Sequence, residues 1–494
     1  MKKRLAVITA VMLVLMLALA ACSSNTTDPS TSTKPSGNGG TTTDGPTGGG
    51  TAGQAKFDGD GNRIIRIGTW YEHFYQSSNE GPEADETSYL NGPEGATARY
   101  ENMKAVEEKL KVKFEWVRMT FEGIMVDLEE GTMSGLPSVD LYEADLQFGL
   151  PAALGGYCVS LDDLAPDGSD PYKEDPQVMK FMEIPGVDTH YLMAPYNPTK
   201  GVYALGFNWT LLKSKGLENP QDLWDRGEWT WEKYKEYCTA LTDTAATPPV
   251  YGMTGYWTNN LDGFMLSNDT GIATGKTETL TDPKTGAVIN LFKELYVDLK
   301  VAKPWDPDDW EKNNTSYADG NIGFFVTNTW MLKEQGGGPE LPLTFEIGVV
   351  PYPVGPSGDK DKNFHNKVSG NWYIIPRGVE NPQLVYDAWF DYNNWYDGDY
   401  ANTKQYDIIA DDEEGALEWW MDELVTAAHG NKELEDNNIR LFGMMSDKET
   451  MDIWGSLNSD FSLVEVMNGE KTPAQLQEEN KQIIQDKLDG FFGG

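Results

Sequence analysis

Between residues 62 and 145 the chain alternates between strand-like and helix-like segments, which restricts the fold more than any other feature of the sequence. Short alternating apolar runs predict strands, and apolar residues three or four positions apart predict helices. The expected elements are strand 62–70, helix 97–111, strand 112–119, helix 121–134 and strand 139–145. This order predicts a parallel α/β sheet, in which ligands bind at the carboxyl ends of the strands.

The rest of the chain carries a second set of α/β segments. Within residues 201–243 we expect a strand, a helix, a proline-containing turn and a second helix capped by Thr230. Further expected elements are strand 250–257, helix 290–300, strand 322–326 followed by a loop, strand 345–353, a strand and then a helix capped by Asn381 within 368–395, and a final helix opening on a capping box at Thr472. Because about 435 residues are too many for one core, we expect two lobes.

Residues 1–21 form a basic and then apolar leader that ends directly before Cys22. The run Leu19-Ala20-Ala21-Cys22 resembles a bacterial lipobox, in which a lipid is attached to the cysteine; an ordinary secretory signal that contains a cysteine is the alternative. Residues 22–60 are mostly Ser, Thr, Gly, Pro and Asp, which predicts a disordered tether. We therefore expect a lipid anchor at the outer face of the cytoplasmic membrane, in a Gram-positive bacterium, and no other membrane contact.

Acidic residues outnumber basic ones by two to one. The chain has 78 Asp+Glu against 39 Lys+Arg, a formal net charge of −39. A field of this sign repels phosphate backbones, so we expect no nucleic-acid partner. Solubility in an external medium is the simplest explanation of the acidity. Aromatic residues reach 12%, which suits both core packing and stacking against sugar rings, and composition alone does not separate these two uses.

No motif predicts a cofactor, a metal site or a catalytic centre. Residues 271–277 resemble a phosphate-binding loop, but Thr270 stands where that loop needs glycine. Residues 58–62 and 359–363 start like calcium loops but lack the glutamate at the twelfth position. The four histidines are scattered. Carboxylates are so numerous that counting does not exclude a glycosidase-type acid pair.

Four segments, in order, resemble a known family. They are MSGLPSVDLYEADL (133–146), GVYALGFNWTLLKSKGLENPQDLWD (201–225), YADGNIGFFVTNTWML (317–332) and VSGNWYIIPRGVENPQLVYDAWFDY (368–392). Together they resemble the extracellular solute-binding protein family 1 of bacterial ABC importers, in which sugar binders predominate. Asp140, Asn208 and Trp330 match family positions, whereas Asn371 replaces a glycine.

The resemblance implies an α/β, two-lobed type II periplasmic-binding-protein fold with three inter-lobe crossings. Lobe I would comprise residues 61–203 and 365–405, and lobe II residues 204–364 and 406–494. The implied function is that of a monomeric receptor that binds a carbohydrate and delivers it to the permease subunits of an ABC importer. An extracellular glycan-processing enzyme with a carboxylate pair is the alternative. Cys158 and Cys238 fall in different lobes, so we expect no disulfide between them.

Candidate ligand-binding residues lie at the ends of expected strands and at family positions. They are Trp70, Tyr71, Glu143, Asp145, Tyr196, Tyr256, Trp257, Asn328, Trp330, Asn371 and Trp372. Anchoring of a loop or packing in the core is the alternative role for each. Trp330 and Trp372 are the expected stacking platforms for a neutral oligosaccharide.

We predict that Cys22→Ala releases the protein from the membrane into the medium, because nothing else in the sequence resembles an anchor. Cell fractionation followed by immunoblotting measures the distribution. Ser23→Ala is the matched control and leaves the protein on the membrane. Unchanged membrane retention of Cys22→Ala would contradict the lipid-anchor interpretation.

Overall fold

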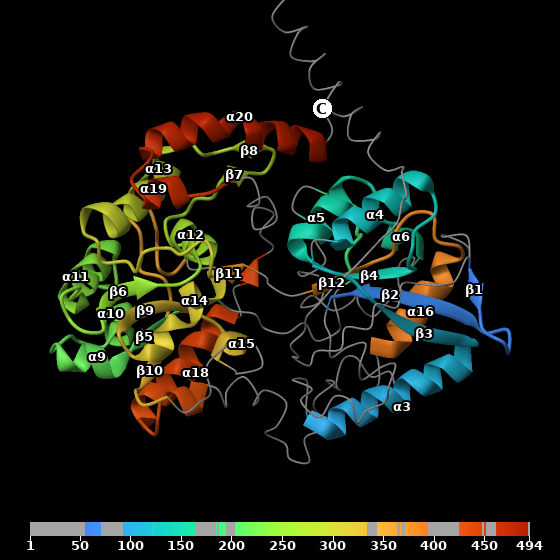
Figure 1. The fold of residues 1–494 in the computed structure, drawn as a ribbon, viewed down its shortest axis with the longest axis horizontal. Coiled ribbons are helices and arrows are strands. Elements are labelled where there is room, and N and C mark those ends of the chain that lie inside the picture. Colours follow the sequence, from blue (N-terminus) through green and yellow to red (C-terminus); the bar gives the residue numbers. More distant parts are fainter. Residues whose placement is uncertain are drawn as a thin grey trace, which may run out of the picture. The chain divides into compact units, whose positions relative to one another are not determined.

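The computed structural model describes residues 55–70, 92–121, 123–164, 184, 187–193, 203–332, 343–362, 366–367, 371–393, 424–446, 449–450 and 461–492. Two main sheets organise these residues, and each sheet with its helices is called a lobe below (Figure 1). The leader, Cys22 and the tether up to residue 54 lie outside the described residues. The end of the tether predicted at 22–60 differs from the prediction, because Lys56–Phe57 form a strand that pairs with Arg63 and Ile64. Within the described residues, no helix has the length and apolar character needed to span a membrane.

The first lobe has a five-stranded mixed sheet. Its strands are β1 (Lys56–Phe57), β2 (Arg63–Thr69), β3 (Val112–Arg118), β4 (Leu141–Asp145) and β12 (Asn371–Ile374). Strands β3 and β4 are parallel to β2, whereas β12 is antiparallel to β4. Its helices are α3 (Gly92–Leu110), α4 (Gly123–Ser134), α5 (Leu146–Leu154), α6 (Leu161–Leu164) and α16 (Pro382–Asn393). In Figure 1, α4 and α5 lie on one face of the sheet, and α3 and α16 lie on the other.

A buried carboxylate joins three segments of the first lobe. Asp140 Oδ1 lies 2.7 Å from Arg63 Nη2, and Asp140 Oδ2 accepts the backbone N–H of Arg66 at 2.9 Å. The Arg63 guanidinium also donates to the Glu380 carbonyl, at 3.4 Å, just before α16. The side chains of Asp140, Arg63 and Arg66 are all buried. Asp140 therefore fixes β2 beside β4 and links both to the returning chain.

The second lobe has a four-stranded sheet in the order β10-β5-β9-β6. These strands are β5 (Ala204–Asn208), β6 (Tyr251–Thr254), β9 (Ile322–Thr327) and β10 (Ile347–Val350). The surrounding helices are α9 (Trp209–Ser214), α10 (Pro220–Asp225), α11 (Trp231–Leu241), α12 (Trp257–Leu266), α13 (Pro283–Lys293), the π-helix η2 (Glu294–Asp298), α14 (Trp310–Thr315), the 3₁₀-helix η3 (Ser316–Asp319), α15 (Thr329–Leu332), α18 (Lys432–Ser446), α19 (Val464–Met467) and α20 (Pro473–Phe492). Two small sheets pair β7 (Ala273–Thr274) with β8 (Thr277–Glu278) and β11 (Asn366–Lys367) with β13 (Glu449–Thr450).

Aromatic packing covers both faces of this second sheet. Phe324 and Phe325 are neighbours on β9, so their side chains leave opposite faces. The ring of Phe324 packs against Trp229 and Tyr234 at centroid distances of 5.6 and 5.1 Å. The ring of Phe325 stacks on Tyr317 of η3 at 4.0 Å. The two aromatic layers explain part of the high aromatic content as core packing.

Side-chain amides satisfy the outer edge of β10. Asn438 of α18 accepts the Val349 N–H at 2.9 Å and donates to the Ile347 carbonyl at 3.0 Å. Gln221 of α10 donates to the Val349 carbonyl and to Asn438 Oδ1, both at 2.9 Å. These amides take the place of a neighbouring strand, so the buried backbone groups of the edge keep hydrogen-bond partners.

The chain passes between the two sheets three times. It leaves the first sheet after β4 to form β5, returns to form β12, and leaves again so that α18 packs on β10. This arrangement confirms the predicted α/β class and its three crossings. Cys158 and Cys238 are both free and buried, and burial raises the pKa of the Cys158 thiol to about 12.

Most predicted elements in the described residues are confirmed, and four differ. The proline-containing turn expected within 201–243 contains the short helix α10, because Asn219 caps it and Pro220 opens it. Thr230 caps α11, and Thr472 and Gln475 form the expected reciprocal capping box. The strand expected at 250–257 ends at Thr254, because α12 begins at Trp257. The helix expected at 290–300 begins earlier, because Asp282 caps it and Pro283 opens it. The loop expected after 326 contains the short helix α15.

We predict that Asp140→Asn lowers the free energy of unfolding by about 3 kcal/mol or more, because it leaves two buried arginines without a counter-charge. Chemical denaturation measures the loss. Asp163→Asn, which removes an exposed carboxylate from α6, is the matched control and changes stability little. Equal stability of the two variants would contradict the role assigned to Asp140.

We predict that Asn438→Ala lowers the free energy of unfolding by about 3 kcal/mol, because it strips partners from buried groups of β10 and from Gln221. The neighbouring Asn437→Ala removes only an exposed contact with Arg440 and serves as the control. A similar loss in both variants, measured by denaturation, would mean that the edge amides are dispensable.

Candidate functional site

Three parallel strands of the first lobe end at the same edge of the sheet, and the candidate residues of this lobe gather there. Trp70 directly follows β2, and Asp145 is the last residue of β4. Asn371, the first residue of β12, pairs with Asp145 because β12 is antiparallel to β4. The structure therefore brings together candidates that are far apart in sequence. Glu143, on β4, is buried and accepts a hydrogen bond from the Thr69 hydroxyl at 2.8 Å.

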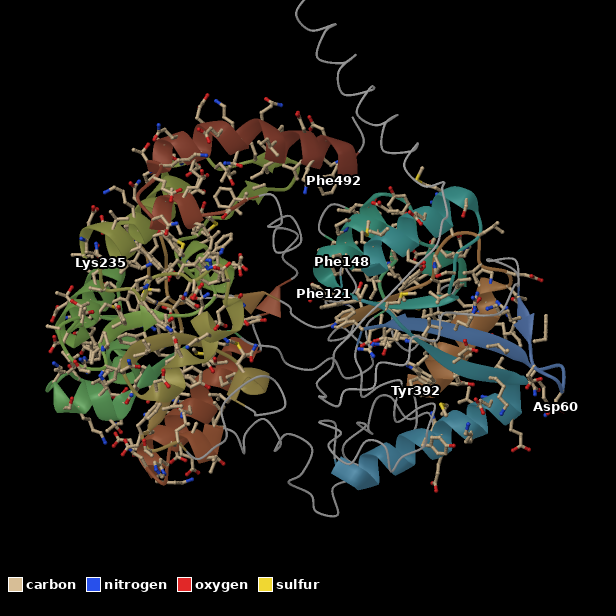
Figure 2. The ribbon with its side chains drawn as sticks, in the orientation of Figure 1. Asp60, Phe121, Phe148, Lys235, Tyr392 and Phe492 are labelled. Atoms are coloured by element: carbon tan, nitrogen blue, oxygen red, sulfur yellow. The ribbon has the colours of Figure 1, made fainter. Side chains whose placement is uncertain are left out.

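Three partly exposed aromatic rings line this edge. Trp70 packs edge-to-face on Phe121 at a centroid distance of 5.1 Å, and Phe121 packs on Phe148 at 4.8 Å. They come from the segments that follow β2, β3 and β4, and Figure 2 shows Phe121 and Phe148 at the same end of the sheet. Sequence reasoning found Trp70 but missed the two phenylalanines. Their position shortly after predicted strands was the signal that could have identified them.

Trp372 does not present a face for stacking in this structure. Its side chain is 1% exposed and belongs to the core of the first lobe, although its neighbour Asn371 lies at the strand-end edge. An aromatic platform needs an open face, so the burial favours the core role over the expected role as a platform. Trp257 is also buried, at 9% exposure, in the first turn of α12.

The candidates of the second lobe lie at the carboxyl ends of β6 and β9, which are parallel. Tyr256 and Trp257 follow β6, and Asn328 directly follows β9. Strand β5 is antiparallel to β9, so Tyr203, just before β5, lies at this edge as well. Sequence reasoning missed Tyr203 because the direction of β5 was not predicted.

Polar groups at this second edge are buried and tightly held. Asn328 Oδ1 accepts the Met331 N–H at 2.8 Å and so caps α15. Tyr352, which follows β10, donates its hydroxyl to Asn260 Oδ1 of α12 at 3.2 Å. Burial raises the pKa of Tyr352 well above its usual value, so this phenol stays a neutral hydrogen-bonding group. Asn260 and Tyr352 were not candidates in the sequence analysis.

Several candidates cannot be placed in this way. Tyr71 and Tyr196 lie outside the described residues. Trp330 lies in α15 and Asn371 in β12, and only their backbones are described.

The motifs that were rejected on sequence have structural roles. Residues 273–278, which overlap the segment that resembles a phosphate-binding loop, form the β7–β8 hairpin rather than the start of a helix. Asp58 accepts the N–H groups of Asp60 and Asn62 in the turn between β1 and β2. Within the described ranges there is no group of three or more His, Cys, Asp or Glu side chains placed to hold a metal ion.

The family model of the bacterial extracellular solute-binding proteins matches residues 101–389, more than half of the chain. The chain is a bacterial extracellular solute-binding protein. The matched region includes β3, β4, the whole second-lobe sheet and β12, so it covers the second-lobe edge and the part of the first-lobe edge that follows β3 and β4, whereas β2 and Trp70 precede it. The predicted family relationship is confirmed. No protein of curated function matches this solute-binding protein by sequence.

Solved structures show the same fold for this solute-binding protein. The GacH receptor of Streptomyces glaucescens, solved with acarbose, is 16% identical, with a TM-score of 0.54 over 87% of this chain and 98% of that one. An ABC substrate-binding protein of Listeria monocytogenes, solved with cycloalternan, is 15% identical, with a TM-score of 0.56 over 86% and 98%. UgpB of Mycobacterium tuberculosis, solved with glycerophosphocholine, is 15% identical, with a TM-score of 0.57 over 86% and 98%.

Proposed function

We propose that this protein is a lipid-anchored receptor that binds a neutral oligosaccharide and delivers it to an ABC importer at the outer face of the cytoplasmic membrane. Membership of the extracellular solute-binding family supports the receptor role. The structural relatives solved with acarbose and with cycloalternan support a carbohydrate ligand. The lipobox at Cys22 and the polar tether support the anchor.

The aromatic row at the first-lobe edge carries the proposal of a sugar ligand. Trp70, Phe121 and Phe148 are partly exposed and lie at the end of a sheet where ligands of α/β proteins bind. A sugar ring has an apolar C–H face that stacks on such rings, while its hydroxyls bond to nearby polar groups. Asp145 is a polar residue at the same edge, and the backbone of Asn371 pairs with it.

The overall charge favours a neutral ligand over an anionic one. A formal net charge of −39 produces a negative potential that lowers the local concentration of anions near the protein. Carboxylates at the first-lobe edge act in the same direction, since Asp145 and Glu143 are the charged candidates there.

We propose that the chain moves as two bodies. One body comprises residues 61–203 and 365–405, and the other comprises residues 204–364 and 406–494. We propose that ligand binding shifts the population from an open to a closed state of these bodies. Such a receptor works as a monomer and needs no catalytic group.

We predict that Trp70→Ala weakens glycan binding about fivefold to tenfold, because an aromatic contact of this kind contributes on the order of 1 kcal/mol and about 1.4 kcal/mol is a factor of ten. Trp330→Ala is expected to do the same, as the family's tryptophan position in the second lobe. Calorimetric titration with maltotriose, maltotetraose and cycloalternan measures the affinities. Trp209→Ala, in α9 at the opposite end of the second sheet, is the matched control and leaves binding unchanged.

Chromatography of each glycan after prolonged incubation with the wild-type protein distinguishes the receptor from the glycan-processing alternative. A receptor returns the glycan intact. Hydrolysis products would contradict the proposed receptor function. Wild-type affinity in both Trp70→Ala and Trp330→Ala would contradict the proposed site.

A further inference from the structure

Three of the six large apolar side chains that are exposed among the described residues lie on α4 and the turn after it. Val126 is 55% exposed, Met133 82% and Leu136 43%. Single exposed apolar residues are common, but several close together mark a surface that another molecule contacts. The opposite side of α4 packs on the first lobe through Ile124 and Leu128.

The turn that ends α4 keeps Leu136 outside the core. Gly135 has a left-handed backbone with φ +70°, and the Leu136 N–H donates to the Gly131 carbonyl at 2.9 Å. In such a turn an apolar residue at the position of Leu136 usually packs on the position of Gly131 or on the one before it. Those positions hold a glycine and Glu130, and Pro137 lies against the glycine. Leu136 therefore stays exposed beside the end of the helix.

Acidic side chains alternate with the apolar ones along the exposed side of α4. Val126 and Met133 are seven residues apart, about two helical turns, so they share one side of the helix. Glu129 and Glu130 are three or four residues from each of them and lie on the same side. These four residues and Leu136 are called the α4 stripe below.

The charge of the α4 stripe restricts what can bind to it. No Lys, Arg or His occurs between Arg118 and Lys173, and neither glutamate of the stripe forms an ion pair with a described residue. Anionic lipid headgroups are repelled, and so is a second copy of this chain, whose formal net charge is −39. The stripe is therefore complementary to an apolar surface that also carries Lys or Arg.

Helix α4 begins beside the candidate ligand edge of the first lobe. Phe121, which contacts Trp70 and Phe148 at that edge, lies between the end of β3 and the start of α4 (Figure 2). The α4 stripe starts one turn into the helix and continues along one face of the lobe (Figure 1). A molecule bound to the stripe thus holds the lobe by the helix that adjoins the ligand edge.

We propose that the α4 stripe is the surface through which the first lobe docks on the importer permease, and that the permease segment in contact carries apolar side chains flanked by Lys or Arg. The proposal rests on the proposed function, since a receptor that delivers its ligand must contact the permease. Charge complementarity speeds association and makes it sensitive to salt, while a small apolar contact keeps it reversible. A receptor that must leave again to collect more ligand needs both properties.

Photo-crosslinking identifies the molecule that contacts the stripe. p-Benzoylphenylalanine replaces Met133 in the full-length lipoprotein, in the native bacterium, and mass spectrometry of the crosslinked peptides identifies the partner chain. We expect a crosslink to a permease subunit. The same amino acid in place of Phe57, which is 61% exposed on β1, is the control and gives no such crosslink. A crosslink from position 133 to another copy of this chain or to a different protein, or no crosslink at all, would overturn the proposal.

Uptake measurements test whether the contact is used for delivery. We expect Met133→Glu and Val126→Glu to lower uptake of the best-bound radiolabelled glycan about tenfold, because each places a carboxylate in an apolar contact. Glu130→Lys lowers uptake as well, since it repels a basic partner. Phe57→Glu is the matched control and keeps wild-type uptake. All variants keep the wild-type melting temperature and the wild-type glycan affinity in calorimetry, because none of these residues lies at a ligand edge.

The two experiments separate failure of the stripe from failure of the proposed function. Wild-type uptake in both Met133→Glu and Val126→Glu would overturn the stripe and leave the receptor role intact. A loss of glycan affinity in these folded variants, equal to the loss of uptake, would also overturn it. If the wild-type protein binds no glycan, the proposed function is wrong, and the crosslink from position 133 alone decides whether the stripe docks on a permease.

Discussion

The first lobe depends on one buried carboxylate. Asp140 neutralises Arg63 and Arg66 of β2 from a position directly before β4, and Arg63 extends the link to the chain before α16. Two arginines without a counter-ion would carry a large desolvation penalty in this interior. The aspartate therefore allows charged residues to lie in a central strand. It also sets the alignment of β2 and β4. Trp70 and Asp145 lie at the carboxyl ends of these two strands, away from Asp140.

This packing gives a structural role to Asp140, which matches a position of the family signature. Asp140 lies before the amino end of β4, whereas the candidate ligand residues follow the carboxyl ends of the strands. Its role in the structure is to hold the scaffold rather than to touch a ligand.

Local sequence signals predicted much of the fold. Apolar alternation located β2 and β3, and the Thr230 and Thr472 caps located the starts of α11 and α20. These features depend on residues within a few positions of one another. The rule that ligands lie at the carboxyl ends of parallel strands then located Trp70 and Asn328 correctly at sheet edges.

Features that depend on long-range packing could not be predicted in this way. The direction of β5 is set by its pairing with β9 and β10, so Tyr203 was missed. Trp372 is the second residue of β12 and lies next to a candidate edge, but its side chain is buried in the core, and no local pattern indicates that burial. The partnership of Tyr352 with Asn260 joins residues 92 positions apart, and no local pattern indicates it.

The amides along β10 have a consequence for contacts between copies of this chain. An open strand edge is a template on which a second chain adds a strand, which leads to aggregation. Asn438 and Gln221 occupy that template from within the same chain. These two side chains therefore disfavour strand addition at β10, which lowers the tendency of copies of this chain to associate through that edge.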